Sequence, residues 1–362
     1  MKEPFISIHI LNYNGKKFLK GCIDSLLKQN YSNFEIVLVD NHSTDDSVSY
    51  IKKLYENEIK ENKVRLLLFE KNHGIAGGYN RSYEQTKADY VLLLNDDIII
   101  PQPYFLKQLL DVSKKEKAPL TSGWTHPFNE TEAEKEMIKK MINPTLTILG
   151  YAIGDVINEN ISLIAGVCCL LVDKSKVKGP LFPEEYFCYG EDVFLGWKSL
   201  LEDTKNIFYR DAAYIHYGSG TIGKGTYFTR YNSEKNRIAN LLIFFEIKTL
   251  IKLFPLFLFE NFVRSIYYIK SPKLFLGFFS AVFWNIKNYK IIKKYRREIQ
   301  KNRKFDDEKI ISLMSYKLFP EHISRFSKAL NNISKSYLKL LNMRTYDLFL
   351  QTATNPKASS NS

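Results

Sequence analysis

Two pairs of adjacent carboxylates are the strongest candidates for chemistry in this chain of 362 residues. Asp96-Asp97 follows the apolar run 90–94, at the point where a buried strand would end. Adjacent carboxylates repel each other unless a cation or hydrogen-bond donors compensate them. A Mg²⁺ or Mn²⁺ ion shared with a diphosphate would do so, because Mg²⁺ binds one or two protein carboxylates together with phosphate oxygens. The pattern favours metal-assisted departure of a nucleoside diphosphate; the alternative is an exposed acidic turn.

Glu191-Asp192 is the second carboxylate pair. It follows the aromatic segment 186–190 and opens an amphipathic helix over residues 191–201. A carboxylate that is held at a helix start and faces an aromatic pocket can act as a general base. The alternative is that both charges only complement the helix dipole, an effect of about 0.3–1 kcal/mol.

His216 ends a short predicted strand and precedes the glycine-rich segment 217–225. This position favours a metal ligand beneath a flexible loop, although a lone histidine is more often structural. Gly218, Gly220 and Gly223 also match the dinucleotide-binding pattern GxGxxG. That pattern should open a helix after the first strand of a βαβ unit. Here it comes late in the chain, so a Rossmann or P-loop nucleotide site is disfavoured.

Earlier parts of the chain predict the sheet that positions these motifs. Four apolar runs alternate with helical segments of apolar spacing. They cover residues 5–11, 34–39, 64–69 and 90–94. The alternation predicts a mainly parallel sheet with right-handed crossovers, and the continuous apolar strands predict helices on both faces. A buried strand over 161–172 and short strands over 206–209 and 212–216 complete the expected α/β fold.

Polar clusters end three of these runs, at residues 12–14, 40–45 and 95–97. In a parallel α/β sheet, ligands bind beyond the carboxyl ends of the strands, so the three clusters should meet at one edge. Asn, Asp and Gly residues after strands are also ordinary turn formers and helix caps. Three such clusters, after the first, second and fourth runs, favour a binding site over that alternative.

Charge divides the chain into two unlike parts. Residues 1–240 hold 30 basic and 31 acidic residues, whereas residues 241–362 hold 22 and 8, a net charge of +14. The second part is also rich in aromatic residues, a combination that suits an anionic membrane interface. The alternative is that its helices pack on the rest of the chain or form a homodimer interface. No nucleic-acid motif accompanies the charge, so nucleic acid is not expected as a partner.

The compartment is predicted from what the sequence lacks. No charge-free run reaches the length of a spanning helix, and no signal peptide is recognisable. The four cysteines show no disulfide framework and suggest reduced thiols of a cytosolic protein. We therefore expect a cytoplasmic protein that is peripheral on the inner face of the cell membrane.

Six segments, in order, resemble the motifs of the family 2 glycosyltransferases. They are residues 7–14, 37–45, 72–80, 93–97, 189–193 and 216–220. The chain looks most like the single-transfer, rhamnosyltransferase-like members, and it lacks the QxxRW motif of processive synthases. The resemblance implies a GT-A fold, which is a Rossmann-like, mostly parallel sheet flanked by helices. It also implies inversion at the anomeric carbon of a nucleotide-sugar.

Donor-binding residues are implied by the same resemblance. They are Asn12, Tyr13, Asn14, Asp40, Asn41, Asn72, Asn80 and Asp96. Within this set, Asp40 matches the residue that reads the nucleotide base, and Asp96 would face the ribose or the sugar. Asn72 and Asn80 fall in the loop and helix that flank the donor.

The resemblance also assigns the metal, the base and the acceptor contacts. Asp97 and His216 match ligands of Mg²⁺ or Mn²⁺, and Asp192 matches the catalytic base. Glu191 and Trp197 are the expected acceptor-binding residues. Trp197 stands where the family often has an arginine, so the acceptor contacts are expected to differ.

Together these features predict an inverting, metal-dependent glycosyltransferase for surface glycan synthesis. It would move a sugar from a nucleotide-diphosphate sugar to a hydroxyl of a saccharide or lipid-linked acceptor. The alternatives are a nucleotidyltransferase that makes nucleotide-sugars and a non-catalytic, membrane-associated sugar-binding protein. The nucleotidyltransferase would need a glycine-rich loop with Arg or Lys after the first strand, which the segment 12–15 lacks.

The same reasoning predicts the domain organisation. The GT-A catalytic domain should cover residues 1–240, with a nucleotide-sugar half over 1–100 and an acceptor half over 101–240. A helical, basic and aromatic extension should follow over 241–350, and a disordered tail over 351–362.

Overall fold

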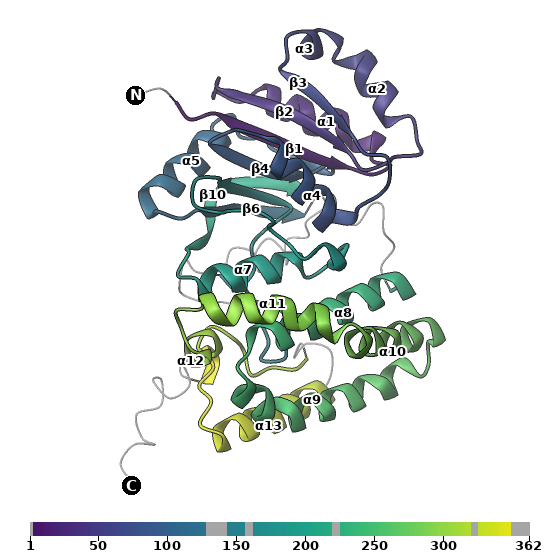
Figure 1. Ribbon diagram of the computed structural model, residues 1–362, viewed down its shortest axis with the longest axis vertical. Helices are drawn as coiled ribbons and strands as arrows, with labels where there is room; N and C mark the ends of the chain where they lie inside the picture. Colours follow the sequence, from purple (N-terminus) through teal and green to yellow (C-terminus); the bar gives the residue numbers. More distant parts are fainter. Residues whose placement is uncertain (1–2, 128–142, 156–161, 219–224, 320–324, 349–362) are drawn as a thin grey trace. The chain divides into compact units, whose positions relative to one another are not determined.

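The computed structural model describes residues 3–127, 143–155, 162–218, 225–319 and 325–348 (Figure 1). The chain forms two compact units. The sheet unit contains residues 1–140, 165–195 and 204–224, and the helical unit contains residues 141–164, 196–203 and 225–362. The predicted domain boundaries at residues 240 and 350 stay predictions. The predicted tail over 351–362 lies outside the described residues.

An eight-stranded sheet forms the centre of the sheet unit, in the order β3-β2-β1-β4-β9-β6-β10-β5. Its strands are β1 (Ile6–Asn12), β2 (Phe34–Asp40), β3 (Val64–Leu68), β4 (Tyr90–Asn95), β5 (Ile98–Ile99), β6 (Leu120–Pro127), β9 (Cys169–Asp173) and β10 (Asn206–His216). Neighbouring strands pair in parallel except where β9 or the short β5 takes part. The mostly parallel α/β sheet predicted from the sequence is therefore confirmed.

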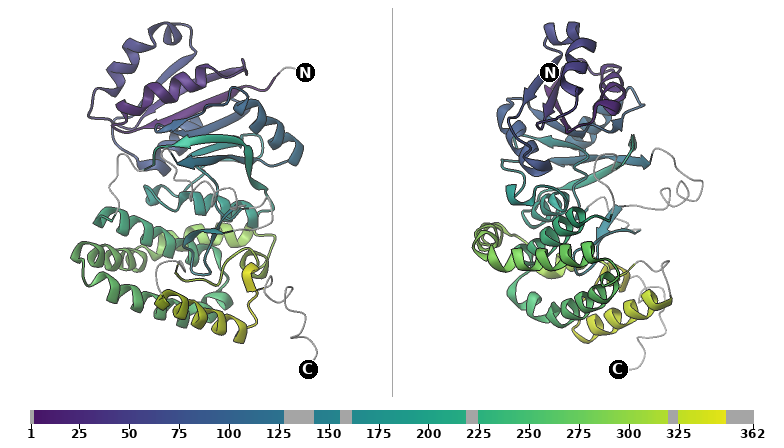
Figure 2. Two further views of the ribbon diagram at one scale, coloured as in Figure 1. Left: turned by 180° about the vertical axis from the view of Figure 1, so that it is seen from behind. Right: turned by 90° about the vertical axis from the view of Figure 1, so that its right-hand side faces the viewer.

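Helices cover both faces of this sheet (Figure 2). They are α1 (Lys16–Leu27), α2 (Ser47–Leu54), α3 (Glu56–Lys60), α4 (Gly74–Gln85) and α5 (Phe105–Glu116). The 3₁₀-helix η1 (Glu184–Tyr186) and α7 (Glu191–Leu201) follow β9 in the chain, and α7 continues past residue 195 into the helical unit. Alternate β1 residues such as Ile8 share one buried cluster with α1 and α5. On the opposite face, α4 packs closely on β1, because a Cβ at Gly78 would lie only 2.7 Å from Leu11 Cδ1.

Strand register brings the carboxyl ends into line. Asn12 at the end of β1 pairs with Asp40 at the end of β2, and Leu11 pairs with Asn95 at the end of β4. The sequence pattern was less accurate at the other end of the sheet. Residues 206–216 form the single strand β10 with an irregularity between Tyr209 and Ala213. Of the buried strand predicted over 161–172, residue 161 lies outside the described residues, and the strand observed is β9, which begins only at Cys169 because Cys169 N donates to Gly166 O in a turn before it.

The helical unit contains a short hairpin and several helices. They are β7 (Asn143–Leu146), β8 (Ala152–Asp155), α8 (Tyr227–Phe244), α9 (Ile247–Tyr268), α10 (Pro272–Lys287), α11 (Tyr289–Asn302), α12 (Asp307–Ile311) and α13 (Arg325–Leu340). The helices α10 and α11 pack on α8. In the part of the chain that the structure describes, no helix is both long and apolar enough to cross a membrane.

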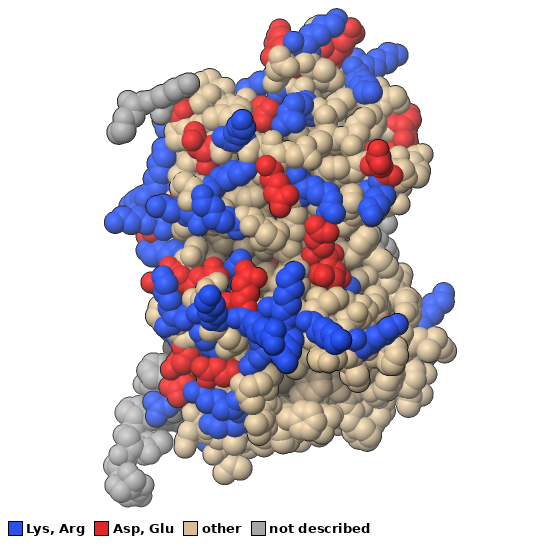
Figure 3. All heavy atoms as spheres, viewed as in Figure 1, with Lys and Arg blue, Asp and Glu red and all other residues tan. Residues whose placement is uncertain are grey.

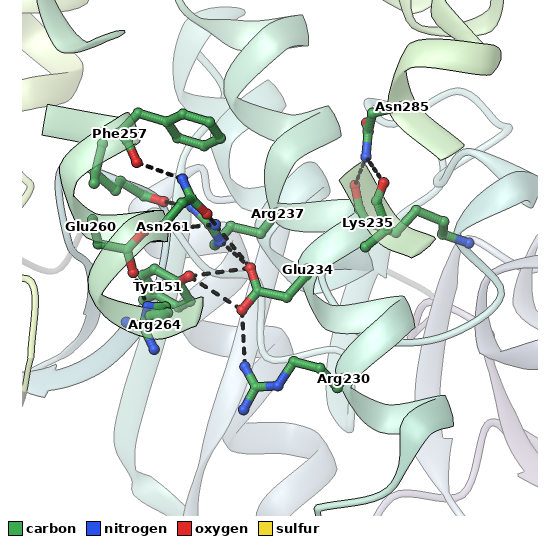
Figure 4. Close-up of polar contacts among 12 residues, drawn as sticks. Tyr151, Arg230, Glu234, Lys235, Arg237, Phe257, Glu260, Asn261, Arg264 and Asn285 are labelled. Carbon is green, nitrogen blue, oxygen red and sulfur yellow. Dashed lines mark hydrogen bonds and ion pairs between the residues drawn. The ribbon is translucent and has the colours of Figure 1, made fainter. Parts of the chain in front are cut away.

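A buried charge cluster joins α8 and α9 (Figure 4). The Glu234 carboxylate accepts hydrogen bonds from Arg230 at 2.9 Å, from Arg237 Nε at 2.8 Å and from the Tyr151 hydroxyl at 3.1 Å. Burial alone would favour the neutral carboxyl, but the nearby arginines outweigh burial and lower the pKa of Glu234. Arg264 on α9 pairs with the fully buried Glu260. The ionised side chains of these two helices thus face each other inside the unit.

Candidate active site

The ends of β1 and β2 are fixed to each other by side-chain hydrogen bonds. The Asn12 amide nitrogen donates to Asp40 Oδ1 at 2.8 Å and to Ser43 Oγ at 2.9 Å. In return, the Asn12 oxygen accepts from the backbone of Gly15 at 3.1 Å, and Asp40 Oδ2 accepts from the Ser43 backbone at 3.0 Å. Asn12 and Asp40 are both buried. Their polar atoms therefore form a preorganised edge beside the turn that follows β1.

Asn14 fixes the loop after β2 from the other side. Its side-chain oxygen accepts from the backbone nitrogens of Thr44 at 2.7 Å and Asp45 at 3.2 Å. Its own backbone nitrogen donates to Ser43 Oγ at 3.0 Å. The Tyr13 side chain between these anchors is exposed, so an aromatic surface is presented at the edge of the sheet.

Asn41 connects β2 to the start of α4. Its amide nitrogen donates to Asn72 Oδ1 and to Gly74 O, both at 3.0 Å, and its oxygen accepts from His73 N at 2.9 Å. Gly74 has a φ of +69°, and a Cβ there would lie 2.3 Å from Phe187 O. Only glycine tolerates both conditions. This contact holds the segment before Glu191 against the start of α4.

Asn80 lies further along α4 and is buried. Its oxygen accepts from the backbones of Leu181 at 2.9 Å and Phe182 at 3.1 Å, and its nitrogen donates to Phe182 O at 2.8 Å. The amide thus holds the 181–182 loop in place. Its predicted donor contact stays a prediction.

Asp96 follows β4 and lies against the turn after β1. A Cβ at Gly15 would lie 1.9 Å from Asp96 Oδ2, so glycine leaves the room that this carboxylate occupies. Burial raises the pKa of Asp96 to about 8, and the negative charge of Asp97 adds to that rise. The neutral carboxyl is favoured until a donor or a cation compensates the charge.

Asp97 and His216 lie side by side. His216 Nε2 lies 3.1 Å from Asp97 Oδ1, and Tyr217 N donates to Asp97 O at 3.1 Å. The antiparallel pairing of Ile98 with His216 sets this contact. Over the described ranges, no group of three His, Cys, Asp or Glu side chains could hold a metal. One carboxylate and one imidazole with 11% and 26% of their side chains exposed leave positions for other oxygen ligands, which suits a cation shared with phosphates.

Glu191 and Asp192 open α7 as predicted. Burial raises the pKa of both carboxyls, and Asp192 raises that of Glu191 further. Asp192 Oδ1 accepts from Val193 N at 2.8 Å, while its backbone oxygen accepts from Ala165 N at 2.9 Å. The Asp192 side chain is only half-buried, so it can meet a substrate hydroxyl. A carboxylate with a raised pKa is the form that general-base catalysis requires near neutral pH.

Cys168 shows that the two acidic motifs share one neighbourhood. Burial raises the pKa of its thiol to about 11, and the charges of Asp192 and Asp97 both contribute. The thiol also lies 3.0 Å from the Tyr214 hydroxyl. Asp97 and Asp192 are 95 positions apart in the sequence, yet both lie within electrostatic reach of one side chain.

Comparison with known proteins agrees with this geometry. Residues 7–178 match the family model described as glycosyl transferase family 2. The chain carries a family 2 glycosyltransferase domain. The family predicted from the six motifs is therefore confirmed, as is the enzyme class at the level of this domain. The rhamnosyltransferase-like branch stays a prediction.

Relatives of this family 2 glycosyltransferase domain share modest identity with it. Glycosyltransferase GlyG of Streptococcus pneumoniae is 24% identical over 219 residues, which are 59% of this chain and 71% of GlyG. An uncharacterized glycosyltransferase of Haemophilus influenzae is 35% identical over 109 residues, 30% of this chain and 42% of that protein. Glycosyltransferase GlyA of S. pneumoniae is 27% identical over 224 residues, and this matched segment is 58% of this chain but only 30% of GlyA.

Two solved structures show the fold. S. aureus TarS 1-349 in complex with UDP-GlcNAc has a TM-score of 0.53 at 19% identity and covers 92% of each chain. GalNAc-T7 with UDP, GalNAc and Mn²⁺ has a TM-score of 0.52 at 13% identity, covering 67% of this chain and 48% of its own. The GT-A fold expected from the sequence is confirmed.

Trp197 lies away from solvent. It belongs to the helical unit and is fully buried. Its ring stacks on that of Phe244 and meets that of Phe245 edge-on, with ring centroids 5.0 Å and 4.9 Å apart. A side chain without exposed surface offers no face to a saccharide, so we leave it out of the acceptor site that we propose below. Glu191 is also buried, but its position next to Asp192 keeps it at the site.

Several residues that hold the site were not found from the sequence. Ser43 bonds both Asn12 and Asn14, and the Tyr79 hydroxyl donates to Asn95 Oδ1 at 3.1 Å. A serine in a polar loop and a tyrosine on a helix carry no distinguishing pattern. Their role depends on a register between strands and helices that sequence spacing does not report.

Proposed function

We propose that this chain is an inverting, metal-dependent sugar transferase that uses a nucleotide-diphosphate sugar. The acceptor would be a hydroxyl of a saccharide or a lipid-linked saccharide. The observation that carries the proposal is the contact of Asp97 with His216, together with the charge effect of both Asp97 and Asp192 on the Cys168 thiol. This arrangement offers a place for a diphosphate and a base for an acceptor hydroxyl at the same site.

The donor would lie along the carboxyl ends of β1, β2 and β4. Asn12 is fully buried and holds Asp40 through the hydrogen bond described above, so the remaining lone pairs of the Asp40 carboxylate can read the base with little loss of entropy. Solved structures of the same fold that contain UDP-GlcNAc or UDP support a nucleotide-sugar donor. Asp96 would meet the ribose or the sugar, where a hydroxyl can share its proton.

Asp97 and His216 would hold Mg²⁺ or Mn²⁺ together with oxygens of the diphosphate. When bound, the cation neutralises negative charge on the diphosphate leaving group. A fold neighbour that contains UDP and Mn²⁺ supports this assignment. Asp97 lies in the turn directly before β5, and β5 pairs with the end of β10 that carries His216, so the positions of both side chains are set before any ligand arrives.

Asp192 would accept the proton of the acceptor hydroxyl as that oxygen attacks the anomeric carbon from the face opposite the diphosphate. This direction of attack inverts the configuration. Glu191 beside it would remain largely protonated, because burial and the Asp192 charge both raise its pKa. A neutral Glu191 can donate a hydrogen bond to the acceptor without competing for its proton.

We also propose that the enzyme works at the inner face of the cell membrane, where a lipid-linked acceptor would be available. The net charge of +14 over residues 241–362 supports attraction to an anionic surface. Similarity to a chondroitin synthase of Escherichia coli, 29% identical over 115 residues, supports a role in glycan synthesis. That segment covers 32% of this chain and 16% of the synthase.

Nucleotide binding with and without metal tests the proposal. In thermal shift measurements with UDP-, GDP- and dTDP-sugars, the nucleotide-sugar that binds should stabilise the protein in the presence of Mn²⁺. The apparent affinity for that nucleotide-sugar should be about tenfold lower, or lower still, in EDTA. Asp97→Asn should remove this metal dependence, whereas Asp111→Asn, an exposed carboxylate on α5, should retain it.

Equal affinity in Mn²⁺ and in EDTA would show that Asp97 and His216 hold no functional metal. The products of turnover separate the alternatives. A glycosyltransferase releases a nucleoside diphosphate from the donor, a nucleotidyltransferase releases pyrophosphate, and a sugar-binding protein releases neither.

A further inference from the structure

One side of α9 is lined with large apolar side chains that face solvent. They are Ile247, Ile251, Phe254, Leu258, Phe262 and Ile266, each more than half exposed. Their spacing of three or four residues places them on one face of the helix. α10 exposes a second row, which consists of Leu276, Phe279, Phe283 and Ile286. We call these ten residues the apolar face.

The apolar face is larger than water normally tolerates. About half of each side chain is exposed, roughly 100 Å² each and on the order of 1,000 Å² in total. The largest apolar patch of a typical soluble monomer is about 300–600 Å². An area of this size is therefore expected to be covered by a partner or a membrane.

A groove lies between the two rows. It has a volume of about 460 Å³ and is lined by α8, α9, α10 and nearby residues, among them Leu241, Leu253, Phe254, Val282 and Ile286. The amide of Asn285 in its wall already donates to Lys235 O at 3.0 Å and to Ala281 O at 2.9 Å (Figure 4). At about 30 Å³ for each water-sized group, the groove has room for roughly fifteen methylenes, which is the size of a fatty acyl chain.

The charges around the apolar face point to a lipid surface. Residues 247–287 contain six basic residues and one acidic residue, Glu260, which is fully buried against Arg264. Exposed lysines follow directly on the apolar residues, for example Lys252 after Ile251 and Lys287 after Ile286. In Figure 3 the surface over α9 and α10 is mostly uncharged, and basic side chains lie along α11 beside it. One partly exposed acid, Glu246, precedes the segment and pairs with Lys248 at 2.9 Å, which leaves the other lysines beside the apolar residues in excess. Apolar residues bordered by an excess of lysines suit an anionic bilayer interface.

The same charges argue against a second copy of this chain as the cover. Two copies joined through the apolar face would place these lysines opposite lysines, because a twofold interface pairs the same surface with itself. Like charges in contact disfavour such an interface. Anionic lipid headgroups, by contrast, complement every lysine at the rim.

We propose that the apolar face docks on an anionic bilayer and that the groove receives one acyl chain of a bilayer lipid. The proposal deepens the proposed function. Only the purpose of docking, which is to bring the active site to a lipid-linked acceptor, rests on the proposed function. The helices lie in the interface with their apolar side chains below the headgroups. The lysines contact the phosphates around them.

Sedimentation of the full chain with lipid vesicles tests the docking. Binding to vesicles of phosphatidylcholine and phosphatidylglycerol should weaken in high salt but persist, because inserted apolar groups are not screened. The double variant Phe262→Asp/Phe283→Asp should bind about tenfold more weakly or worse, because two inserted side chains are lost. Leu68→Asp/Tyr104→Asp, which changes two exposed apolar residues of the sheet unit, should bind like the native chain.

A reporter in the apolar face distinguishes insertion from surface adsorption. Tryptophan fluorescence of Phe283→Trp should be quenched by vesicles with brominated acyl chains, whereas that of Tyr104→Trp should show no added quenching. Val282→Trp, which fills the groove, should lose binding of the fluorescent fatty acid parinaric acid while vesicle binding remains. Failure of the native chain to bind parinaric acid would overturn the acyl-chain part of the proposal.

The docking proposal is wrong if the native chain ignores anionic vesicles at low salt. If light scattering then shows a dimer that Phe262→Asp/Phe283→Asp disperses, the apolar face is an interface between copies. Release of nucleoside diphosphate from a soluble donor, measured on the same proteins, separates this result from the proposed function. Vesicle binding without any donor turnover would overturn the function and leave the docking intact.

Discussion

The sheet unit and the helical unit distribute their polar groups in opposite ways. In the sheet unit, continuous apolar strands form the interior, and polar side chains such as Asn12, Asp40 and Asp97 gather where the strands end. In α8 and α9, the ionised groups of Glu234 and Glu260 lie inside, and large apolar side chains lie outside. The first pattern is the one expected of a protein that binds a polar ligand at a sheet edge in water. The second is expected where the outer surface does not face water alone.

Because of this contrast, we expect the loss of a single charge to affect turnover in the sheet unit and stability in the helical unit. At the sheet edge, single charges should matter for turnover while leaving stability nearly unchanged, because the local backbone is held by amides and serines. In the helical unit, single charges should matter for stability, because each one balances another in a buried cluster. Substituting one carboxylate in each unit tests the distinction directly.

Asp192→Asn should have the largest effect on activity. The change retains the shape of the side chain but removes the proton acceptor, so turnover should fall by about 10²-fold to 10⁴-fold while donor affinity is nearly unchanged. Because burial raises the pKa of Asp192, the acid limb of the native rate profile should lie above the ordinary range of an aspartate. The residual rate of the variant should lack that limb.

Exposed Asp111→Asn is the matched control and should retain native turnover and its pH profile. Near-normal transfer by Asp192→Asn would assign the base to another residue. A parallel loss of stability in both variants would instead indicate that aspartates in the sheet unit act through folding.

Glu234→Gln should have the largest effect on stability. It leaves Arg237 and Arg230 without their buried counter-charge, at a cost of about 3–5 kcal/mol in the free energy of unfolding. The arginines lower the pKa of Glu234 against the effect of burial. Its contribution is therefore complete above the unfolded pKa of about 4.3 and is lost as the pH falls through the lower folded value.

Chemical denaturation followed by circular dichroism over a range of pH measures this effect. The native chain should lose stability in the acid range, and the Gln variant should show a flatter dependence there. Glu298→Gln, an exposed carboxylate on α11, is the control and should differ little from the native chain. Equal stability of the two variants would mean that the buried cluster contributes no net stability.

The sequence predicts the sheet edge well because the relevant signals are local. Asn12, Asp40 and Asp97 each follow an apolar run, and parallel pairing then brings the ends of such runs together whatever the loops contain. The Glu191-Asp192 pair was found because it opens a helix. The contact of Asp97 with His216 could not be derived from spacing, because it depends on the two-residue strand β5 pairing with β10.

The sequence does not show which side chains of the helical unit are buried, nor which face of each helix lies inside. Trp197 lies one turn along the helix from Asp192, yet Phe244 and Phe245 enclose it, and these residues come from far along the chain. The amphipathic spacing of α9 predicts an apolar face but not whether that face is inside or outside. The only acidic residue of α9, Glu260, is fully buried and lies 3.9 Å from Arg237 of α8, so its side of α9 faces inward, and that contact between helices is visible only in three dimensions.

Gly78→Ala should have the smallest effect of the three substitutions and tests how closely α4 packs on the sheet. Alanine gains up to about 1 kcal/mol in helix propensity. Its Cβ, however, would lie 2.7 Å from Leu11 Cδ1, and such overpacking costs about 1–3 kcal/mol. Gly21→Ala on α1 is the matched control, because its Cβ would meet Ile99 Cδ1 at an ordinary 3.4 Å and should be neutral or stabilising. The change in the free energy of unfolding, measured by denaturation, should therefore be a loss in Gly78→Ala and no change or a gain in Gly21→Ala. If α4 moves away from β1 to relieve the clash, Asn72 and Gly74 at its start move with it, and nucleotide affinity should fall in Gly78→Ala alone. Equal affinity in the two variants would show that the site does not depend on this contact.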